Sequence, residues 1–269
     1  MAADAHRDFK DRLYGQFARI GKALSNPHRL ELLELLAQGE RTVESLASEI
    51  GLSLANTSQH LQTLRQTSLV ESRKQGLYVY YRLADPAVCD VSTAIRTVAE
   101  QRLAELDRLV RDHFGDRSSA EPVQMEELLK RARAQDVVIL DARPAREYVA
   151  GHIAGAISVP IDELQRRLRQ LPKDKEYVAY CRGPYCVYAD HAVDIIRSKG
   201  RRARRLLEGF PEWRAAGFPV HTGLEQYPRP ERAQQGERVG VVVGPHEHKQ
   251  RPPDSRAYRS GHRRASSPG

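Results

Sequence analysis

The chain has 269 residues and a formal net charge of +8 at pH 7. That length fits two modest domains better than one, and the excess of basic side chains makes nucleic acid a natural partner. Residues 1–13 carry charges throughout, and no apolar run approaches the roughly 18 residues that span a bilayer, so we expect a cytoplasmic protein without a membrane partner. Its three cysteines, Cys89, Cys181 and Cys186, are too few for a secreted disulfide framework and indicate catalysis, redox chemistry or metal binding.

Helical periodicity dominates the start of the chain. Apolar residues at steps of three or four predict a helix over residues 9–24 with one buried face. Pro27 suits the first turn of a second helix, which Gly39 ends. Thr42 can then cap a short helix that runs to Ile50.

The next helix has the features of a DNA-reading helix. Gly51 supplies a sharp turn before it, and it runs through Leu64. Its polar side chains could bond phosphates or base edges in a major groove, and they are Ser53, which can also cap the helix, Asn56, Thr57, Gln59, His60, Gln62 and Arg65. A helical hairpin with a solvated polar face is the alternative interpretation of this stretch taken alone.

A β-hairpin follows this helix. Residues 69–73 and 77–83 are rich in Val, Tyr and Leu, and we expect the chain to turn between them at Gln75 and Gly76. Arg73 and Lys74 make the tip basic. The hairpin therefore forms a wing that could reach flanking phosphates or a minor groove.

These elements, in this order, resemble the arsenic-repressor (ArsR/SmtB) family of winged-helix transcription factors over roughly residues 9–114. The resemblance rests on A-L-S-N-P-H-R-L-E-L-L-E-L-L, on L-A-S-E-I-G-L-S-L-A-N-T-S-Q-H-L-Q-T-L-R and on the wing ending Y-V-Y-Y-R-L. It implies a dimer that binds a palindromic operator in double-stranded DNA, and in many members an inducer that releases the DNA.

The segment 86–113 supports a homodimer independently. Its apolar residues lie mostly three or four apart, which predicts one long helix that needs a partner. Dimerisation through this helix would place two recognition helices about one DNA turn, ~34 Å, apart. We therefore assign residues 1–114 to a DNA-binding and dimerisation domain.

The sequence argues against a metal inducer, and we predict neither a metal nor another cofactor. Metal sensors that the chain resembles commonly carry a Cys-x-Cys pair before the recognition helix, or His and Asp clusters on the last helix. In this chain the segment before the recognition helix reads T-V-E-S-L-A-S and contains no cysteine. The Asp residues and His113 of the last helix are not arranged to enclose an ion. Cys89 is then either a small core residue or a redox group.

Composition divides the rest of the chain into a linker, a second domain and a tail. Residues 115–122 are small and polar and end in proline, which is typical of a linker. The second domain covers residues 123–222. Residues 223–269 lose apolar periodicity except at 239–243, and we expect a disordered basic tail whose arginines add non-specific affinity for DNA.

Short apolar strands alternate with helices in the second domain. Helices are expected over residues 125–133 and 161–170, and strands over 137–140, 157–160 and 177–180. This alternation predicts a three-layer α/β fold with a parallel sheet, whose ligand sites lie at the carboxyl ends of the strands.

Cys181 occupies such an end and begins a loop that leads into an amphipathic helix. Backbone N–H groups and the positive end of the helix dipole favour an anion there. The Cys181 thiol should therefore ionise readily and act as a nucleophile.

The second domain resembles the rhodanese family. The resemblance rests on D-A-R-P-A-R-E-Y-V-A-G-H-I-A-G-A-I-S-V-P, on C-R-G-P-Y-C and on E-G-F-P-E-W-R-A-A-G-F-P-V. It implies a sulfurtransferase in which the Cys181 thiolate takes a sulfane sulfur from a small-molecule donor, holds it as a persulfide and passes it to a thiol acceptor.

The resemblance also implies roles around the loop. Backbone N–H groups from Arg182 to Val187 would cradle the persulfide anion, and Gly183 would allow the backbone to bend. Arg182 would either add positive charge near an anionic donor or lie solvated at the surface. The signature residues expected to brace the loop and fill the core are Asp141, Arg143, His152 and Trp213.

The residues around the thiol also bear on competing chemistry. Phosphatases and arsenate reductases related to this fold need an arginine six positions after the cysteine, where this chain has Val187, so sulfur chemistry is favoured. Two interpretations of Cys186 remain open. It is either a small side chain that closes the loop or a resolving thiol that attacks the Cys181 persulfide.

Three functions remain open from the sequence. The first is a dimeric regulator in which a Cys181 persulfide couples reactive sulfur to operator binding. The second is primarily a sulfurtransferase, from a thiosulfate or persulfide donor to a thiol or cyanide acceptor, with an independent, autoregulatory DNA-binding domain. The third is a non-catalytic rhodanese fold used for interaction. A winged helix without a metal site, joined to an intact thiol loop, favours the first.

Overall fold

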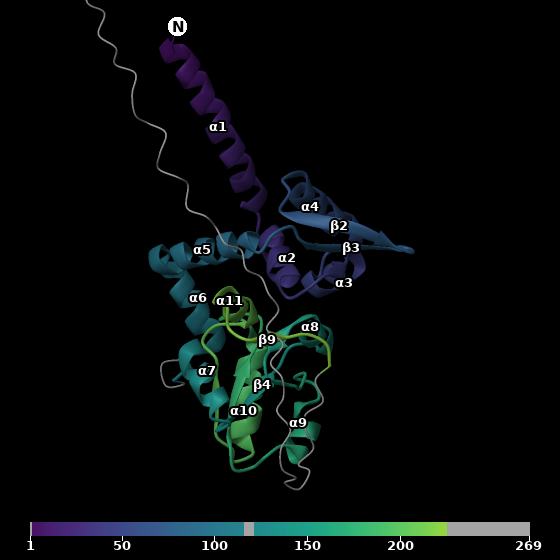
Figure 1. Ribbon diagram of the computed structural model, residues 1–269, viewed down its shortest axis with the longest axis vertical. Coiled ribbons are helices and arrows are strands. Elements are labelled where there is room, and N and C mark those ends of the chain that lie inside the picture. The colour runs from purple at the N-terminus through teal and green to yellow at the C-terminus, as the bar shows by residue number, and fades with distance from the viewer. Residues whose placement is uncertain (1, 116–120, 225–269) are drawn as a thin grey trace, which may run out of the picture. The chain divides into compact units, whose positions relative to one another are not determined.

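The computed structural model describes residues 2–115 and 121–224 (Figure 1). Residues 1–227 cluster into one compact unit, which holds a helical winged helix-turn-helix followed by a domain with a parallel sheet, as predicted. Most of the expected linker and nearly all of the expected tail lie outside the described residues. Within the described ranges, no helix is long and apolar enough to cross a membrane.

The caps and turns of the helix-turn-helix follow the sequence prediction. The first helices are α1 (Ala2–Leu24), α2 (Pro27–Ala37), α3 (Val43–Ile50) and α4 (Leu54–Gln66). The side chains of Thr42 and Ser53 accept hydrogen bonds from the first turns of α3 and α4. Gly51, between these helices, has a φ of 68°, a conformation that favours glycine.

The winged-helix core lies between α2, α3, α4 and the small sheet. It is made of leucines that are almost fully buried, among them Leu32, Leu46, Leu61 and Leu64. Each such side chain contributes about 1.5–3 kcal/mol relative to an exposed position. The core fixes the orientation of α4, the predicted DNA-reading helix.

The predicted buried face of α1 is wrong for the single chain. Phe9 and Phe17 are 59% and 57% exposed, and only the C-terminal part of the helix, with Ile20, Ala23 and Leu24, packs against the core. The helix also begins earlier than predicted, at Ala2. The apolar residues nearer the start of the helix therefore lie on the surface of the chain.

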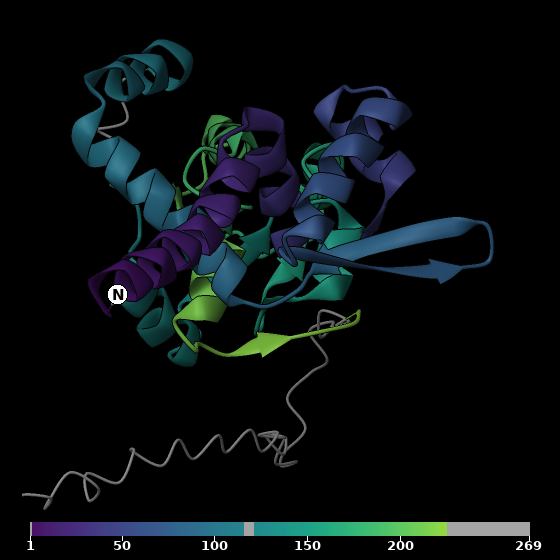
Figure 2. The ribbon, with the colours of Figure 1, turned by 90° about the horizontal axis from the view of Figure 1, so that it is seen from above.

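The wing is an antiparallel hairpin at the edge of a three-stranded sheet with the order β1-β3-β2. Its strands are β1 (Arg41–Thr42), β2 (Val70–Gln75) and β3 (Tyr78–Leu83). The turn lies one residue later than predicted, at Gly76 and Leu77, because Gln75 still pairs with Tyr78 and Gly76 takes a φ of 60°. Figure 2 shows the hairpin projecting from the winged-helix core.

The predicted single helix over residues 86–113 is two helices, α5 (Ala87–Arg102) and α6 (Ala104–Phe114). Leu103 between them is extended, with φ −109° and ψ 98°. Neither proline nor glycine stands at the break, so no local signal marked it. The change of direction brings Leu106 of α6 beside α2 and α5 at the wall of a cavity. The exposed apolar residues of α5 are Val91, Ile95 and Val98.

The second domain contains a four-stranded parallel sheet with the order β6-β4-β7-β8. Its strands are β4 (Val137–Asp141), β6 (Ile157–Ser158), β7 (Glu176–Tyr180) and β8 (Ala203–Arg205), and a separate antiparallel pair is formed by β5 (His152–Ile153) and β9 (Val220–His221). The helices are α7 (Met125–Arg133), α8 (Ala145–Ala150), α9 (Leu164–Arg167), α10 (Val187–Ser198) and α11 (Phe210–Ala215).

Successive side chains of the central strands pack into two separate cores, one on each face of the sheet. The domain therefore has three layers. Val138 and Leu140 of β4 pack on the α9 and α10 side, while Ile139 packs on the side of α7 and α11. Both faces of the central strands are buried, as their continuous apolar runs predicted. The helix predicted over residues 161–170 is shorter, because a turn precedes α9 and the 3-10 segment Leu168–Gln170 follows it.

Candidate functional site

The Cys181 loop leaves the carboxyl end of β7 and enters α10 at Val187. Cys181 is buried, and in this structure it forms a disulfide with Cys186, with the two Cα atoms 6.1 Å apart. The loop between them is therefore a small ring of six residues. Its position at the carboxyl end of a central parallel strand is where the fold places ligand sites.

The loop backbone is held from α11. The N–H of Phe210 donates to the carbonyl oxygen of Cys181 at 3.1 Å. A Cβ atom on Gly209 would lie 2.4 Å from backbone atoms of Arg182 and Gly183, so only glycine allows this approach. Sequence reasoning missed Gly209 as a site residue, although it lies in the closing E-G-F-P signature.

The backbone bends at Gly183, but the conformation there does not require glycine. Its φ lies outside the left-handed region, and a Cβ there would meet only the Arg96 guanidinium, at 3.8 Å. The Cys186 N–H, one of the groups expected to cradle an anion, donates to the Gly183 carbonyl oxygen at 3.2 Å. In this disulfide-bonded state, one N–H group of the predicted cradle is therefore already occupied by a hydrogen bond within the loop.

Arg182 is neither a solvated surface residue nor a free cation beside the thiol. Its side chain is 11% exposed, and its Nε lies 3.0 and 3.1 Å from the two carboxylate oxygens of Glu147 in α8. Its Nη2 also pairs with Glu49 of α3, in the helix-turn-helix. Burial lowers the pKa of Arg182, but the two carboxylates outweigh burial and raise it.

Glu49 and Glu147 hold further arginines, and together they form what we call the arginine–glutamate cluster. Its members are Arg41, Glu49, Arg146, Glu147 and Arg182. Arg41 bridges the two carboxylates, with Nη1 2.7 Å from Glu49 and Nη2 2.6 Å from Glu147. The cluster therefore joins the winged helix to the Cys181 loop through partly buried ion pairs. Sequence reasoning missed it, because its members are far apart in the chain.

A second, fully buried network lies beneath the loop. The Arg143 guanidinium donates to Asp141 at 2.6 Å and to the Gly151 carbonyl oxygen at 2.7 Å. Tyr180 also donates to Asp141, at 2.5 Å. Burial and the Asp141 carboxylate raise the pKa of Tyr180 well above its usual value, so its hydroxyl remains a donor.

The buried network also reaches the winged helix. Nη1 of Arg143 donates to the side-chain oxygen of Gln38, the residue after α2, at 2.9 Å. The side-chain nitrogen of Gln38 lies 3.4 Å from the Arg182 carbonyl oxygen. Gln38 thus contacts both the signature arginine and the Cys181 loop.

The two remaining signature residues lie in the core of the domain. His152 is fully buried and stacks on Tyr148, with 3.6 Å between ring centroids. Trp213 is 1% exposed and donates from Nε1 to the Pro219 carbonyl oxygen at 2.9 Å. Trp213 belongs to the core on the α7 and α11 side of the sheet, whereas Cys181 belongs to the core on the opposite side.

The candidate DNA-contacting residues of α4 do not share one face. Asn56, Gln59 and Arg65 are exposed, whereas Thr57 is completely buried. The prediction for Thr57 is therefore wrong, because the leucine face of α4 turns its side chain into the core. Ser53 is exposed, and its hydroxyl caps the helix.

Two of the remaining candidate DNA-contacting residues, His60 and Arg73, interact with other side chains of the protein. His60 is half-buried near His28, and burial, with help from Arg29 and His28, lowers its pKa. Arg73 pairs with Glu40 at 2.5 Å and lies over the Tyr80 ring, while Lys74 is exposed on the wing. The basic tip is thus present, with one of its two cations already paired.

Cys89 is a free, half-buried thiol on α5, and burial raises its pKa. Among the described residues, no group of three or more His, Cys, Asp and Glu side chains could hold a metal ion. The thiol lies at a cavity between α2, α5 and the Cys181 loop, lined also by Arg182 and Tyr185.

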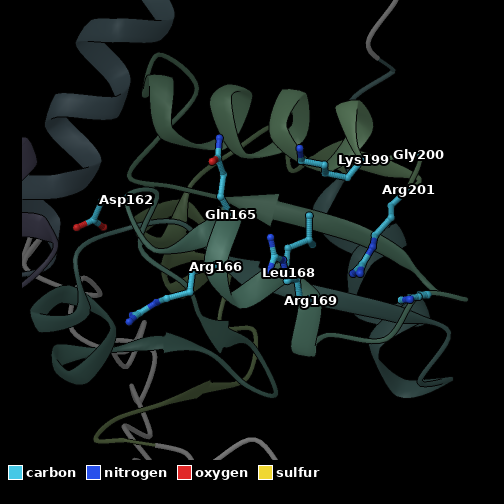
Figure 3. A pocket seen from close by; sticks show the side chains of 9 residues that line it. Asp162, Gln165, Arg166, Leu168, Arg169, Lys199, Gly200 and Arg201 are labelled. Carbon is cyan, nitrogen blue, oxygen red and sulfur yellow. The ribbon is translucent and has the colours of Figure 1, made fainter.

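A larger hollow of about 1050 Å³ lies elsewhere in the second domain (Figure 3). Five basic residues and one acid line it, namely Arg166, Arg169, Lys173, Lys199, Arg201 and Asp162. It lies by the amino end of β7, whereas Cys181 follows the carboxyl end, about 17 Å away along a five-residue strand. This hollow is therefore separate from the thiol site.

A winged helix-turn-helix joined to a domain with a cysteine loop defines a transcriptional regulator with a rhodanese-like domain. Residues 26–72 match the family described as "Bacterial regulatory protein, arsR family", and residues 124–216 match "Rhodanese-like domain". The HTH-type transcriptional regulator Rv0324 of Mycobacterium tuberculosis is 46% identical over 216 residues, which are 80% of this chain and 95% of that protein. The chain belongs to the ArsR family of DNA-binding regulators and carries a rhodanese-like domain.

Solved structures match the two domains separately. A homodimeric winged helix-turn-helix DNA-binding domain from Mycobacterium bovis, a possible ArsR-family regulator, is 44% identical, and the match covers 36% of this chain and 89% of that one with a TM-score of 0.34. A rhodanese-related protein from Thermoplasma volcanium is 26% identical, and the match covers 37% of this chain and 96% of that one with a TM-score of 0.34.

Proposed function

We propose that this regulator senses reactive sulfur through a persulfide on Cys181 and that the chemical state of Cys181 alters its affinity for an operator. One observation carries the proposal. Arg182, the residue directly after Cys181, pairs with Glu49 of the helix-turn-helix. A change at the sulfur that moves the loop therefore acts on a side chain bonded to the DNA-binding unit.

The first step is sulfur capture by the reduced loop. The Cys181 thiolate attacks the sulfane sulfur of a donor such as thiosulfate, the donor's S–S bond breaks, and sulfite leaves with the electron pair. The product is a Cys181 persulfide. The place of Cys181 at the end of β7 and at the entrance to α10 supports this role, because backbone N–H groups there favour an anion.

The pairing of Cys181 with Cys186 supports a resolving role for Cys186. Its thiolate attacks the Sγ atom of the Cys181 persulfide, hydrosulfide leaves, and the disulfide forms. A low-molecular-weight thiol then reduces the disulfide and is itself oxidised. The loop consequently has three chemical states: dithiol, persulfide and disulfide.

Two contacts would carry a change of the loop to the winged helix. Through its side chain, Arg182 binds Glu49, and through its carbonyl oxygen it faces Gln38. Glu49 lies in α3, which packs against α4. Because guanidinium–carboxylate pairs are directional, a shifted Arg182 changes the positions of α3 and α4 that the ion pairs favour.

A homodimer completes the proposed regulator. The apolar stripe of α1 and the apolar face of α5 are exposed on the single chain, and a partner would bury them. The related Mycobacterium bovis fragment is described as homodimeric. Two α4 helices about one DNA turn apart would then read a palindromic operator.

A second function is a sulfurtransferase whose DNA-binding domain acts independently. The complete cysteine loop and the separate cores of the second domain favour it. It predicts turnover of thiosulfate to cyanide or thiol by the full chain, together with operator binding that sulfur does not change.

The deciding experiment measures operator affinity with and without polysulfide. A duplex selected from random DNA serves as operator, and the proteins are the wild type and Cys181→Ser. We expect a persulfide or disulfide in the wild type by mass spectrometry and a change in affinity of roughly fivefold or more, within the usual range of allosteric coupling. Equal affinity in all four conditions contradicts coupling, and an unmodified Cys181 contradicts the sulfur chemistry as well.

A further inference from the structure

The basic hollow of the second domain takes no part in the sulfur chemistry proposed above, yet it is built like a ligand site (Figure 3). Its volume of about 1050 Å³ lies close to the upper end of the range of about 300–1,000 Å³ that is usual for small-molecule sites. Three segments line it, namely α9 with its flanking turns, the loop at Lys173, and the turn after α10. A ligand of matching size would contact all three.

The lining of the hollow carries an excess of positive charge. Five bases and one acid leave it with a formal charge of +4. The acid, Asp162, lies at the opposite end of the hollow from Lys199 and Arg201 in Figure 3. The potential at the Arg201 end is therefore positive and favours an anion.

Few carboxylates neutralise these bases. Arg166 shares Glu163 with Arg167, at 3.6 and 3.7 Å. Because exposed bases are hydrated, each of them alone binds an anion weakly, whereas several that act on one ligand bind it together. Three further exposed bases of the lining form no ion pair with any residue that the structure describes, and they are Arg169, Lys173 and Lys199.

Arg201 is the partly buried base of the hollow, and its side chain is held in place by neutral groups. Its Nη1 donates to the Tyr177 hydroxyl at 2.8 Å and lies 3.3 and 3.4 Å from the carbonyl oxygens of Leu171 and Pro172. These partners orient the guanidinium but do not neutralise its charge. Its Nε and Nη2 make no hydrogen bond with a described residue, and such a pair of donors matches two oxygens of one phosphate group.

The carboxyl end of α10 borders the hollow and does not cancel this preference. A helix carboxyl end carries about half an elementary negative charge, which opposes an anion. Here the Ile196 carbonyl oxygen accepts from the N–H groups of Lys199 and Arg201, and that of Arg197 accepts from Gly200. These hydrogen bonds occupy carbonyl groups within the turn, and the nearby bases outweigh the partial charge that remains.

We infer that this hollow binds a small molecule that carries a chain of phosphate groups, either a nucleoside triphosphate or inorganic polyphosphate. Such a chain places several negative charges along one line, which matches bases that come from three separate segments. A single phosphate ion would reach only one or two of them. A DNA duplex is too broad to enter a hollow of this volume and would touch only its rim.

The test measures the binding of three phosphate probes to the full-length protein by titration calorimetry. Salt at about 0.15 M screens loose attraction to exposed charges. We expect saturable binding of inorganic triphosphate, at least roughly tenfold tighter than that of orthophosphate, a difference of about 1.4 kcal/mol. Adenosine triphosphate should bind as well, and its affinity distinguishes the two sources. An affinity above that of inorganic triphosphate identifies a nucleotide, and an equal affinity identifies the phosphate chain alone.

Two double variants with the same loss of charge locate the binding. Arg169→Gln combined with Lys173→Gln removes two exposed bases of the hollow and should weaken triphosphate binding roughly tenfold. Lys130→Gln combined with Arg133→Gln removes two exposed bases of α7, outside the hollow, and should leave the affinity unchanged. Because all four side chains are exposed, neither variant disturbs the core.

Several results would overturn the inference. They are the absence of saturable triphosphate binding by the wild type, equal affinity for orthophosphate, and an equal loss of affinity in the two double variants. Weaker operator binding by the hollow variant, with unchanged triphosphate binding, would assign these bases to DNA instead. Cys181→Ser should bind triphosphate as the wild type does, so failure of the sulfur proposal and failure of this one are distinguishable.

Discussion

At the scale of single residues, two neighbouring side chains of α4 differ in role. One lies in the core and bears on stability, and the other is exposed, where it could contact DNA. Thr57 is fully buried among the leucines of the winged helix, and its hydroxyl has no hydrogen-bond partner among the described residues. A buried hydroxyl without a partner costs free energy, because it loses water and gains nothing in return. Its neighbour Asn56 is exposed and able to reach DNA.

Replacing Thr57 should therefore stabilise the protein without weakening operator binding. We expect Thr57→Val to raise the free energy of unfolding by about 1 kcal/mol, since a methyl group replaces the unsatisfied hydroxyl. Urea denaturation measures the change, and Thr63→Val is the matched control because the Thr63 hydroxyl donates to the Gln59 carbonyl oxygen. If Thr57→Val weakens operator binding while Asn56→Ala does not, the assignment of the two faces is wrong.

Gly209 controls how closely α11 approaches the Cys181 loop. In Gly209→Ala the new methyl group would meet backbone atoms at 2.4 Å, so we expect a loss of about 1–3 kcal/mol of stability, typical of overpacking. Persulfide formation at Cys181 should fall as well, as mass spectrometry after thiosulfate treatment can measure. Gly21→Ala on α1, with no atom within 4 Å of the new methyl, should not destabilise the protein. Equal effects of both substitutions would contradict the role of the close contact.

Glu49 should make the free energy of unfolding depend on pH in the acid range. Burial raises its pKa, but Arg182 and Arg41 outweigh burial, so the pKa in the folded protein lies below the ordinary value of 4.5. The stabilisation that ionised Glu49 contributes to the free energy of unfolding is therefore fully present above pH 4.5. It is lost as the pH falls through the lower pKa that Glu49 has in the folded protein. Urea unfolding at a series of acid pH values should show a shallower loss in Glu49→Gln than in the wild type. The exposed Glu126→Gln variant should follow the wild type, and three identical pH profiles would contradict the prediction.

At the scale of elements, two helices present apolar faces that the single chain does not bury. Val98 of α5 is 60% exposed and Phe17 of α1 is 57% exposed. Such faces are stable at the surface when a partner covers them. The homodimer proposed above buries both.

A charge on the α5 face should prevent dimerisation. We expect Val98→Glu to be monomeric at micromolar concentration by sedimentation and to bind a palindromic operator far more weakly, because a buried unpaired charge is costly. Thr97→Glu, adjacent in sequence but on a different side of the helix, should remain dimeric. A dimeric Val98→Glu protein would show that α5 is not the interface.

Local signals explain which elements the sequence predicted. Thr42, Ser53 and Gly51 act within a few residues, so the caps and turn of the helix-turn-helix were predictable, and the apolar run of β4 identified a buried strand. The extended Leu103 and the exposed stripe of α1 were not, because neither depends on a local signal. The Cys181 loop was predicted as a contiguous motif. The arginine–glutamate cluster was missed because Arg41 and Glu147 meet only after both domains have folded.

At the scale of the whole molecule, the two domains share a polar interface instead of being joined by a linker alone. The cluster and the Gln38–Arg143 contact are partly or fully buried, so their geometry is held by packing. Removing one partner of such a buried pair leaves the other charge uncompensated. The interface is therefore suited to transmit a change at Cys181, and Glu49 is the member that belongs to the DNA-binding unit.

The most direct test of this account compares operator affinity of the thiol-reduced and polysulfide-treated protein in three backgrounds. The wild type should show a ratio of affinities of roughly fivefold or more. Glu44→Gln, an exposed position on the same helix as Glu49, should keep that ratio, whereas Glu49→Gln should bring it close to one while the Cys181 persulfide still forms. A ratio near one in the wild type, or an undiminished ratio in Glu49→Gln, would contradict coupling through the Arg182–Glu49 pair.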